Sequence, residues 1–383
     1  MTIDFESFTP ELLRRHPTEK WSRPGIGAWV AEMDFGVPPA VAEVLRAVVD
    51  AGALAYPTDR QLAEARAATT RWLARTSGWE TDPGQVQLVA DVLTALAATL
   101  EHLVEPGAPV ILPVPNYMPF LTLPEVFGHP VLRVPGTSTP RGRHAMDLEG
   151  IDAAFRAGGR LLILCNPHNP VGRVYDREEL LALAAVVDAH GGRVFSDEIH
   201  APLVLEPTCR HVPYASLDRR TAAHSVTALA ASKGWNIPGL KCAQLILTND
   251  DDARRLAPFS PFLAHQASTP GLLATAAAYD RCDAWLAEVV AHLRANAARL
   301  GELVAENLPG VGYHEPEGTY LAWLDTRALP VDNPSRFFAE RAGVVTTDGA
   351  SCGAPGFVRF NLAMARGTLE RALRQMGDAL AAG

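Results

Sequence analysis

Short apolar runs alternate with amphipathic stretches between about residue 80 and residue 250. The short runs predict buried strands, and the longer stretches predict helices between them. Strands are predicted at residues 86–90, 109–113, 131–134, 161–165, 193–197 and 225–231. Helices are predicted over residues 91–104 and from Asp176 to just before Gly191, where Asp176 and Glu179 have the spacing of a capping box. This alternation is typical of a mostly parallel sheet flanked by helices.

The pattern changes after about residue 285. It predicts one long helix over residues 285–307, strands near 319–324 and 357–362, and a terminal helix from Thr368. This order of helices and strands is typical of a smaller α+β domain. We therefore predict an α/β fold with a large domain over residues 46–285. A small domain is predicted from the two chain ends, residues 1–45 together with 286–383.

Charge and cysteine content exclude several function classes. The 383 residues include 34 Lys and Arg against 43 Asp and Glu, a formal charge of −9 without a basic run, which predicts no nucleic-acid partner. The five cysteines contain no CxxC pair, so neither a disulfide framework nor a metal site is predicted. No basic segment precedes an apolar run at the N-terminus, and prolines interrupt the apolar stretch 106–124. We expect a cytoplasmic protein without a membrane partner.

Polar residues follow four of the predicted strands directly. Asn169 lies in the loop after residues 161–165, Asp197 ends the next strand, and Lys233 follows residues 225–231. The strand at 86–90 leads into a helix N-terminus, where free N–H groups can bind a phosphate. Because the carboxyl ends of parallel strands share one sheet edge, these groups should converge. A carboxylate, a carboxamide, an amine and a phosphate cradle suit a phosphorylated pyridine aldehyde such as pyridoxal 5'-phosphate (PLP).

Seven stretches together carry a resemblance to a known family. They occur in family order at residues 29–35 (WVAEMDF), 115–120 (PNYMPF), 165–172 (CNPHNPVG), 196–200 (SDEIH), 231–236 (ASKGWN), 318–325 (GTYLAWLD) and 359–363 (RFNLA). The chain resembles fold-type I PLP enzymes of the aminotransferase class I/II superfamily, and within it the cystathionine β-lyase-like C–S lyases. The resemblance implies a large PLP-binding domain and a homodimer.

The resemblance also implies roles for individual residues. Lys233, one of only three lysines in the chain, would bond the cofactor aldehyde and later move the Cα proton. Asp197 would pair with the pyridinium nitrogen, and Asn169 would donate to the phenolic oxygen of the ring. Tyr117 would stack on the ring face and take part in catalysis. Arg359 would bind the substrate α-carboxylate in a bidentate pair.

Further residues are implied around the cofactor and the substrate. Ser232 and Lys241 would help to hold the phosphate, and Tyr56 would reach it from the partner subunit. His200 stands where many aminotransferases have a tyrosine that bonds the ring oxygen. Trp29 and Asn169 would also contact substrate.

Three positions depart from the family pattern. Ala55 replaces the usual glycine before Tyr56, Ala230 replaces a hydroxyl residue, and Asp91 replaces the glycine that opens the phosphate-binding helix. An anionic Asp91 beside a phosphate is unfavourable. We expect it to turn outward as the helix N-cap, which leaves the N–H groups of Val92 and Leu93 for the phosphate.

Single residues also have simpler structural interpretations. Asp197 could cap a turn, Tyr117 and Trp29 could be core aromatics, and His200 could be a structural histidine, since nothing gives it metal-ligand spacing. Arg359 on an apolar strand is harder to explain in this way, because a buried arginine requires an anion.

The sequence does not decide between two reaction types, transamination and β-elimination. The same residues would serve a transaminase and a β-lyase, because both begin by removing the Cα proton. His200 and the motifs at 29–35 and 166–172 favour β-elimination from L-cystathionine or another S-substituted L-cysteine. An aminotransferase is the alternative, and a PLP-binding regulatory protein with little turnover is an alternative of another class.

Overall fold

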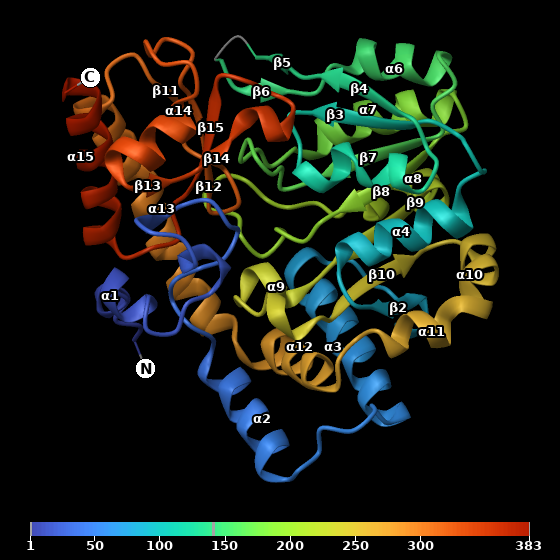
Figure 1. Cartoon of the computed structure of the whole chain (residues 1–383). Helices are drawn as coiled ribbons and strands as arrows, with labels where there is room; N and C mark the ends of the chain where they lie inside the picture. Colours follow the sequence, from blue (N-terminus) through green and yellow to red (C-terminus); the bar gives the residue numbers. More distant parts are fainter. Residues whose placement is uncertain (1, 140–141, 383) are drawn as a thin grey trace.

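A seven-stranded sheet forms the centre of the computed structural model, which describes residues 2–139 and 142–382 (Figure 1). Along the sheet the strands are β2 (Val86–Val89), β10 (Ala243–Leu247), β9 (Ser225–Leu229), β8 (Arg193–Asp197), β7 (Leu161–Cys165), β3 (Val110–Val114) and β4 (Val131–Pro135). Only β10 runs antiparallel to its two neighbours in this sheet. The predicted α/β fold with a mostly parallel sheet is therefore confirmed.

Helices cover both faces of the central sheet, and strands β2, β7, β9 and β10 are therefore buried along their whole length. One face packs against α4 (Val92–Leu103) and α10 (Asp250–Leu256), and the other against α6 (Leu148–Arg156) and α7 (Arg177–Ala189). The remaining helices of this part are α3 (Asp59–Ser77), α5 (Leu123–Val126), α8 (Arg219–His224), α9 (Ala231–Gly234), α11 (Ser260–His265) and α12 (Thr269–Arg281). The capping box expected from Asp176 and Glu179 is present on α7.

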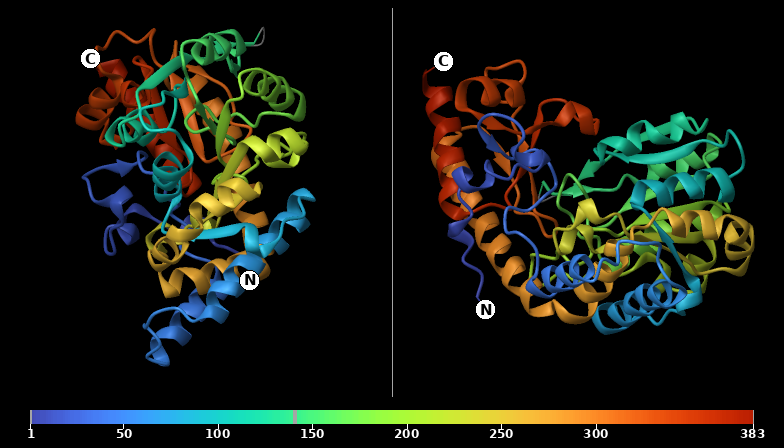
Figure 2. Two further views of the ribbon diagram at one scale, coloured as in Figure 1. Left: turned by 90° about the vertical axis from the view of Figure 1, so that its right-hand side faces the viewer. Right: turned by 60° about the horizontal axis from the view of Figure 1, so that its bottom comes forward.

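A second, antiparallel sheet lies beside the first and contains residues from the last third of the chain. Its order is β11 (Gly312–Tyr313), β12 (Leu321–Asp325), β15 (Phe357–Asn361) and β14 (Thr347–Asp348). The long helix α13 (Asp283–Asn307) and the terminal helix α15 (Arg366–Ala382) pack together in the same core cluster (Figure 2). Short helices of this part are α1 (Pro10–Leu13) and α14 (Pro334–Phe337). The helix α2 (Pro39–Asp50) packs against α12, and the pair β5 (Thr137–Ser138) and β6 (His144–Ala145) follows β4 of the central sheet (Figure 1).

The chain's N-terminal segment joins this second part directly. Strand β1 (Ile26–Gly27) pairs in parallel with β13 (Val344–Val345), and Asp34 N–H donates to the Ala363 carbonyl at 3.1 Å. Residues near both ends of the chain therefore contact each other in one region. The domain boundaries at 45/46 and 285/286 stay a prediction. No helix in the described ranges is long and apolar enough to cross a membrane.

Several predicted elements differ from the observed ones by one or two residues at an end. The strand predicted over 225–231 stops at Leu229, because Ala231 already begins α9. The strand predicted from Thr319 begins at Leu321, since Thr319 has a left-handed φ of 70°, which an extended strand does not allow. The terminal helix begins two residues earlier, at Arg366.

A buried ion pair anchors the N-terminal segment. Lys20 Nζ lies 3.0 Å from Asp34 Oδ1, and the two side chains are 0% and 1% exposed. Trp21 Nε1 donates to the same carboxylate oxygen at 2.7 Å, and Lys20 Nζ also donates to the Ala363 carbonyl at 3.0 Å. The pair thus fixes residues 29–34 against the C-terminal part of the chain.

We expect Lys20→Met to lower the free energy of unfolding by about 3–5 kcal/mol, because it leaves the Asp34 carboxylate buried without its cation. Urea unfolding followed by circular dichroism measures the loss. Arg71→Met is the matched control, since Arg71 pairs with Asp280 while 47% exposed and should cost less than about 1 kcal/mol. Equal losses for the two variants would contradict the prediction.

Candidate active site

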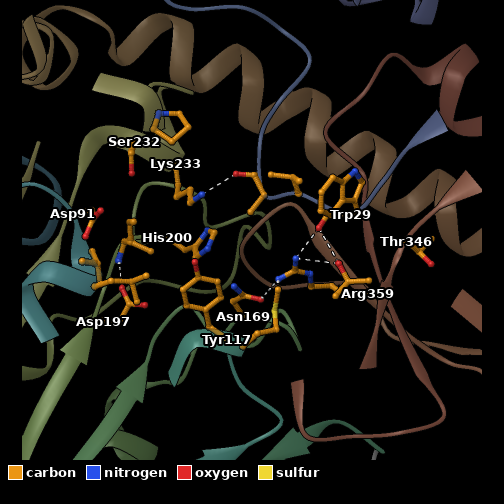
Figure 3. Close-up of a pocket in the computed structure, with 18 of the residues that line it drawn as sticks. Trp29, Asp91, Tyr117, Asn169, Asp197, His200, Ser232, Lys233, Thr346 and Arg359 are labelled. Atoms are coloured by element: carbon orange, nitrogen blue, oxygen red, sulfur yellow. Dashed lines mark hydrogen bonds between the residues drawn. The ribbon is translucent and has the colours of Figure 1, made fainter. Parts of the chain in front are cut away.

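One pocket of about 670 Å³ lies where the two parts of the chain meet (Figure 3). Eleven of the twelve residues predicted for the site line it: Trp29, Val92, Leu93, Tyr117, Asn169, Asp197, His200, Ser232, Lys233, Lys241 and Arg359. They come from the ends of β8 and β9, from the loops after β7 and β3, from the start of α4, from the residues before β10, from strand β15 and from the N-terminal segment. The remaining residue, Tyr56, is 81% exposed and lies outside the pocket lining.

Asp197 ends β8 and is only 4% exposed. Its Oδ1 accepts from the Ile199 N–H at 3.1 Å, and the Cys165 thiol lies 3.8 Å from Oδ2. Burial raises the pKa of Asp197 to about 7, and the negative charge of Glu198 acts in the same direction. Such a carboxylate is poised to pair with a cationic group entering the pocket.

The raised pKa predicts how the stability of the cofactor-free protein depends on pH. Because folded Asp197 keeps a proton that the unfolded chain has lost, wild-type stability should fall relative to Asp197→Asn as pH rises from about 4 to about 7. The difference should reach at most about 4 kcal/mol and stay constant above that range. Urea unfolding of both proteins at pH 4.5, 6 and 8, without added cofactor, measures it. If the stability of the two proteins changed with pH in the same way, the raised pKa of Asp197 would be ruled out.

Lys233 lies in α9, the one-turn helix that follows β9. Its Nζ donates to the Ala31 carbonyl at 2.8 Å, so the amine sits against the N-terminal segment. Burial lowers the pKa of Lys233 to about 8, and the positive charge of Arg359 contributes. A larger fraction of this amine is therefore unprotonated near neutral pH than in an exposed lysine, as a nucleophile or base requires.

Arg359 lies on β15 and is 2% exposed. Nη1 donates to Asn169 Oδ1 at 3.0 Å, and Nη2 donates to the Trp29 carbonyl at 2.8 Å and to Thr347 Oγ1 at 3.2 Å. All these acceptors are neutral, and the buried Nε has no partner within the described residues. The guanidinium thus has hydrogen-bonding capacity left for an anion, which a carboxylate would satisfy.

Tyr117 and His200 stand on the pocket wall between Asp197 and Arg359 (Figure 3). Tyr117 packs edge-on against Phe120 with ring centroids 5.4 Å apart, and burial raises its pKa. His200 is 2% exposed, and burial lowers its pKa to about 3, so the imidazole is neutral. Its Nδ1 has no partner in the part of the chain that the structure describes. The arrangement can receive a flat, polar ring.

The start of α4 forms the other end of the pocket. Asp91 is the N-cap of α4, as expected, and its Oδ1 accepts from the Thr94 N–H at 2.8 Å. The expectation that Asp91 turns outward is wrong: it lines the pocket, and Oδ2 accepts from Lys241 Nζ at 2.9 Å. The ammonium group of Lys241 thus offsets the negative charge of Asp91 inside the pocket. The N–H groups of Val92 and Leu93 lie in the first helical turn, which lacks intrahelical acceptors.

Residues 29–31 of the N-terminal segment line the pocket, and side chains from the C-terminal part of the chain bind the backbone of this segment. Asn361 Nδ2 donates to the Glu32 carbonyl at 2.7 Å, and Tyr320 OH donates to the Ala31 carbonyl at 2.8 Å. The sequence analysis assigned neither residue a role, although both lie in the motifs that carried the resemblance. The sequence feature that could have identified them is a polar group in an apolar stretch: Asn361 ends the buried strand β15, and Tyr320 directly precedes the buried strand β12.

Comparison with known proteins decides the family. The family described as aminotransferase class I and II matches residues 29–376. The chain belongs to this family. Within the aminotransferase class I and II family, it is similar to the cystathionine beta-lyase of Corynebacterium glutamicum, with 35% identity over 97% of this chain and 99% of the relative.

Solved structures of the aminotransferase class I and II fold agree with the geometry. Cystalysin from Treponema denticola, a structure that contains PLP, is 26% identical, covers 100% of both chains and has a TM-score of 0.92. N-succinyldiaminopimelate aminotransferase from Mycobacterium tuberculosis is 28% identical over 92% of each chain, with a TM-score of 0.84. The architecture of this chain is thus shared by a PLP-containing structure and by an aminotransferase.

Proposed function

We propose that this protein is a PLP-dependent C–S β-lyase that cleaves L-cystathionine or another S-substituted L-cysteine to pyruvate, ammonia and a thiol. The observation that carries the proposal is the convergence of Lys233, Asp197 and Arg359 on one pocket, with Arg359 buried and bonded to neutral groups alone. The names of the relatives and the presence of His200 three residues after Asp197 support a lyase rather than a transaminase.

The pocket residues fit PLP. The buried Asp197 carboxylate has neutral contacts with Ile199 and Cys165, so it can pair with a pyridinium nitrogen. Asn169 can donate to the phenolic oxygen through its amide N–H groups, because its Oδ1 already accepts from Arg359. At the other end, the first turn of α4, Ser232 and Lys241 form the phosphate end of the pocket.

The chain's own groups account for the steps of elimination. Lys233 supplies the amine that holds the cofactor and then takes the Cα proton of a substrate whose α-carboxylate is held by Arg359. PLP, when bound, supplies the electron sink for the pair left on Cα. The Cβ–S bond then breaks, and sulfur leaves with its electron pair as a thiolate. The resulting 2-aminoacrylate takes up water and yields pyruvate and ammonia.

Supplying L-cystathionine without any 2-oxo acid tests the proposal. We expect equal amounts of pyruvate and free thiol, measured with lactate dehydrogenase and a thiol reagent. No product from several cysteine thioethers, with amino transfer once a 2-oxo acid is added, would favour the aminotransferase. Absence of any turnover would favour a PLP-binding regulatory protein.

We further propose a homodimer in which Tyr56 reaches the phosphate of the partner's site. Tyr56 is 81% exposed and lies next to His265, with ring centroids 5.1 Å apart. Leu54 and Phe262 are exposed at 65% and 69%, and large apolar side chains of this kind are typical of a face that a second copy covers.

Mixed dimers test the placement of Tyr56. Tyr56→Phe and Lys233→Ala should each be impaired, whereas a hybrid of the two variants should regain close to half of the wild-type activity per dimer. One site of the hybrid then combines a native Lys233 with the partner's native hydroxyl. Separately tagged subunits, co-expressed and purified by both tags, give the hybrid. Activity no higher than that of the Tyr56→Phe dimer would place Tyr56 within its own subunit or outside the site.

A further inference from the structure

The active-site pocket continues beyond Arg359, away from Lys241 and the start of α4. Arg23, Asn333, Arg336 and Asp348 line this far end. With the α-carboxylate on Arg359, the far end is left for the group carried on the substrate sulfur. We call it the substituent end.

Arg23 is connected to Arg359 through Trp29. The Trp29 carbonyl accepts from Arg359 Nη2 at 2.8 Å, and the Arg23 guanidinium carbon lies 3.8 Å from the centroid of the Trp29 ring. Stacking on an indole face holds a guanidinium plane while leaving its N–H edge free. Arg23 is exposed, so that edge is open to a ligand.

Arg336 reaches the same end by a second set of contacts. Thr347 Oγ1 accepts from Arg359 Nη2 at 3.2 Å, and the next residue, Asp348, accepts from Asn333 Nδ2 at 2.9 Å. Asn333 Oδ1 in turn accepts from the Arg336 N–H at 2.8 Å as the N-cap of α14. Arg23 and Arg336 therefore come from opposite ends of the chain to one compartment.

The charges at the substituent end are unbalanced. Within residues 2–139 and 142–382, neither Arg23 nor Arg336 forms an ion pair. Asp348 is the carboxylate that lines this end, and its oxygens accept from Ala350 N–H and Asn333 Nδ2, both at 2.9 Å. At the opposite end, by contrast, Lys241 is paired with Asp91. Two guanidinium groups and one carboxylate thus line the substituent end, and neither guanidinium is paired with that carboxylate.

We propose that Arg23 and Arg336 bind a carboxylate at the distal end of the sulfur substituent. The preferred substrates are then L-cysteine thioethers whose substituent is anionic. The inference rests on the proposed lyase function and adds the substrate class. Paired guanidinium groups favour a carboxylate over a neutral amide of the same shape, because only the carboxylate accepts charge-assisted hydrogen bonds.

A pair of substrates that differ in one charge tests the inference. S-(2-carboxyethyl)-L-cysteine and S-(2-carbamoylethyl)-L-cysteine have nearly the same size, and pyruvate release reports on both. We expect kcat/KM for the carboxylate to exceed that for the amide about tenfold or more with the holoenzyme. The ratio should fall to about 1–2 in the Arg23→Gln/Arg336→Gln double variant. Arg341→Gln, an exposed arginine outside the pocket lining, should keep the wild-type ratio.

Binding gives a second measurement. L-2-aminopimelate has a methylene in place of the sulfur of the carboxyethyl substrate and cannot undergo the elimination. Calorimetry with the holoenzyme should show tighter binding of this compound than of its ω-amide, and the double variant should lose the difference.

The outcomes separate the two proposals. A wild-type ratio near 1, with pyruvate formed from both thioethers, overturns the inference and leaves the lyase function in place. A preference that survives in the double variant also overturns it, because the anion site then lies elsewhere. No pyruvate from either thioether or from S-methyl-L-cysteine overturns the lyase function itself.

Discussion

Lys233→Ala should reduce pyruvate formation from cysteine thioethers by at least about 10³-fold. A positioned general base contributes about 10²–10⁴-fold, and the variant also loses covalent attachment of the cofactor. The fold should persist, because Lys233 makes one hydrogen bond, to the Ala31 carbonyl. Steady-state rates with a saturating thioether measure the loss of activity, and circular dichroism checks that the fold persists.

Lys233→Arg is the matched control for this prediction. It keeps a positive charge, but a guanidinium cannot give up its proton at neutral pH and so cannot act as the base. We expect it to be as inactive as the alanine variant, and borohydride reduction should leave neither variant with a covalent label. Label found on Lys241 or Lys20 of the wild-type protein would refute the assignment of Lys233.

Arg359→Gln should lower kcat/KM by about 30-fold to a few thousand-fold. Removing one member of a buried, hydrogen-bonded charge pair costs about 2–5 kcal/mol, and each 1.4 kcal/mol is a factor of ten. Most of the effect should fall on KM, because the α-carboxylate is bound before and during the reaction. Initial rates across a wide range of substrate concentration separate the two constants.

Arg359→Lys should rescue little of this loss. A lysine keeps the charge but lacks the planar fork that bonds a carboxylate while also donating to Asn169 and Trp29. Thr347→Val serves as the comparison, since it removes a single 3.2 Å hydrogen bond to Arg359 and should cost much less. Full activity of Arg359→Lys would contradict a bidentate role.

The central fold could be predicted from sequence because most of its strands are short, largely apolar and bounded by turn residues. Strand β10 was missed, although Ala243–Leu247 is entirely buried. An apolar run of this kind does not reveal its direction, and β10 is antiparallel to both neighbours. The 19-residue helix α3 was missed as well, because its exposed face carries many charged residues and only part of it is buried.

The site could be predicted where each residue follows a strand, as Asp197 and Lys233 do. The position of Asp91 could not, because its partner Lys241 is 150 residues away and is brought to it by tertiary packing. Arg23 and Arg336 were missed for the same reason. Nothing in the sequence around either arginine marks it, and the two chain regions meet through tertiary contacts such as the pairing of β1 with β13.

The distribution of lysines determines how this protein responds to chemical labelling. The chain has three lysines, and most of its positive charge is carried by arginine. Lys20 is completely buried and Lys233 is inside the pocket, whereas the side chain of Lys241 is 56% exposed. Among the lysines, amine-reactive dyes, cross-linkers and coupling resins will therefore modify Lys241 first. Attachment through Lys241 would add a group to the end of the candidate active-site pocket that the start of α4 forms.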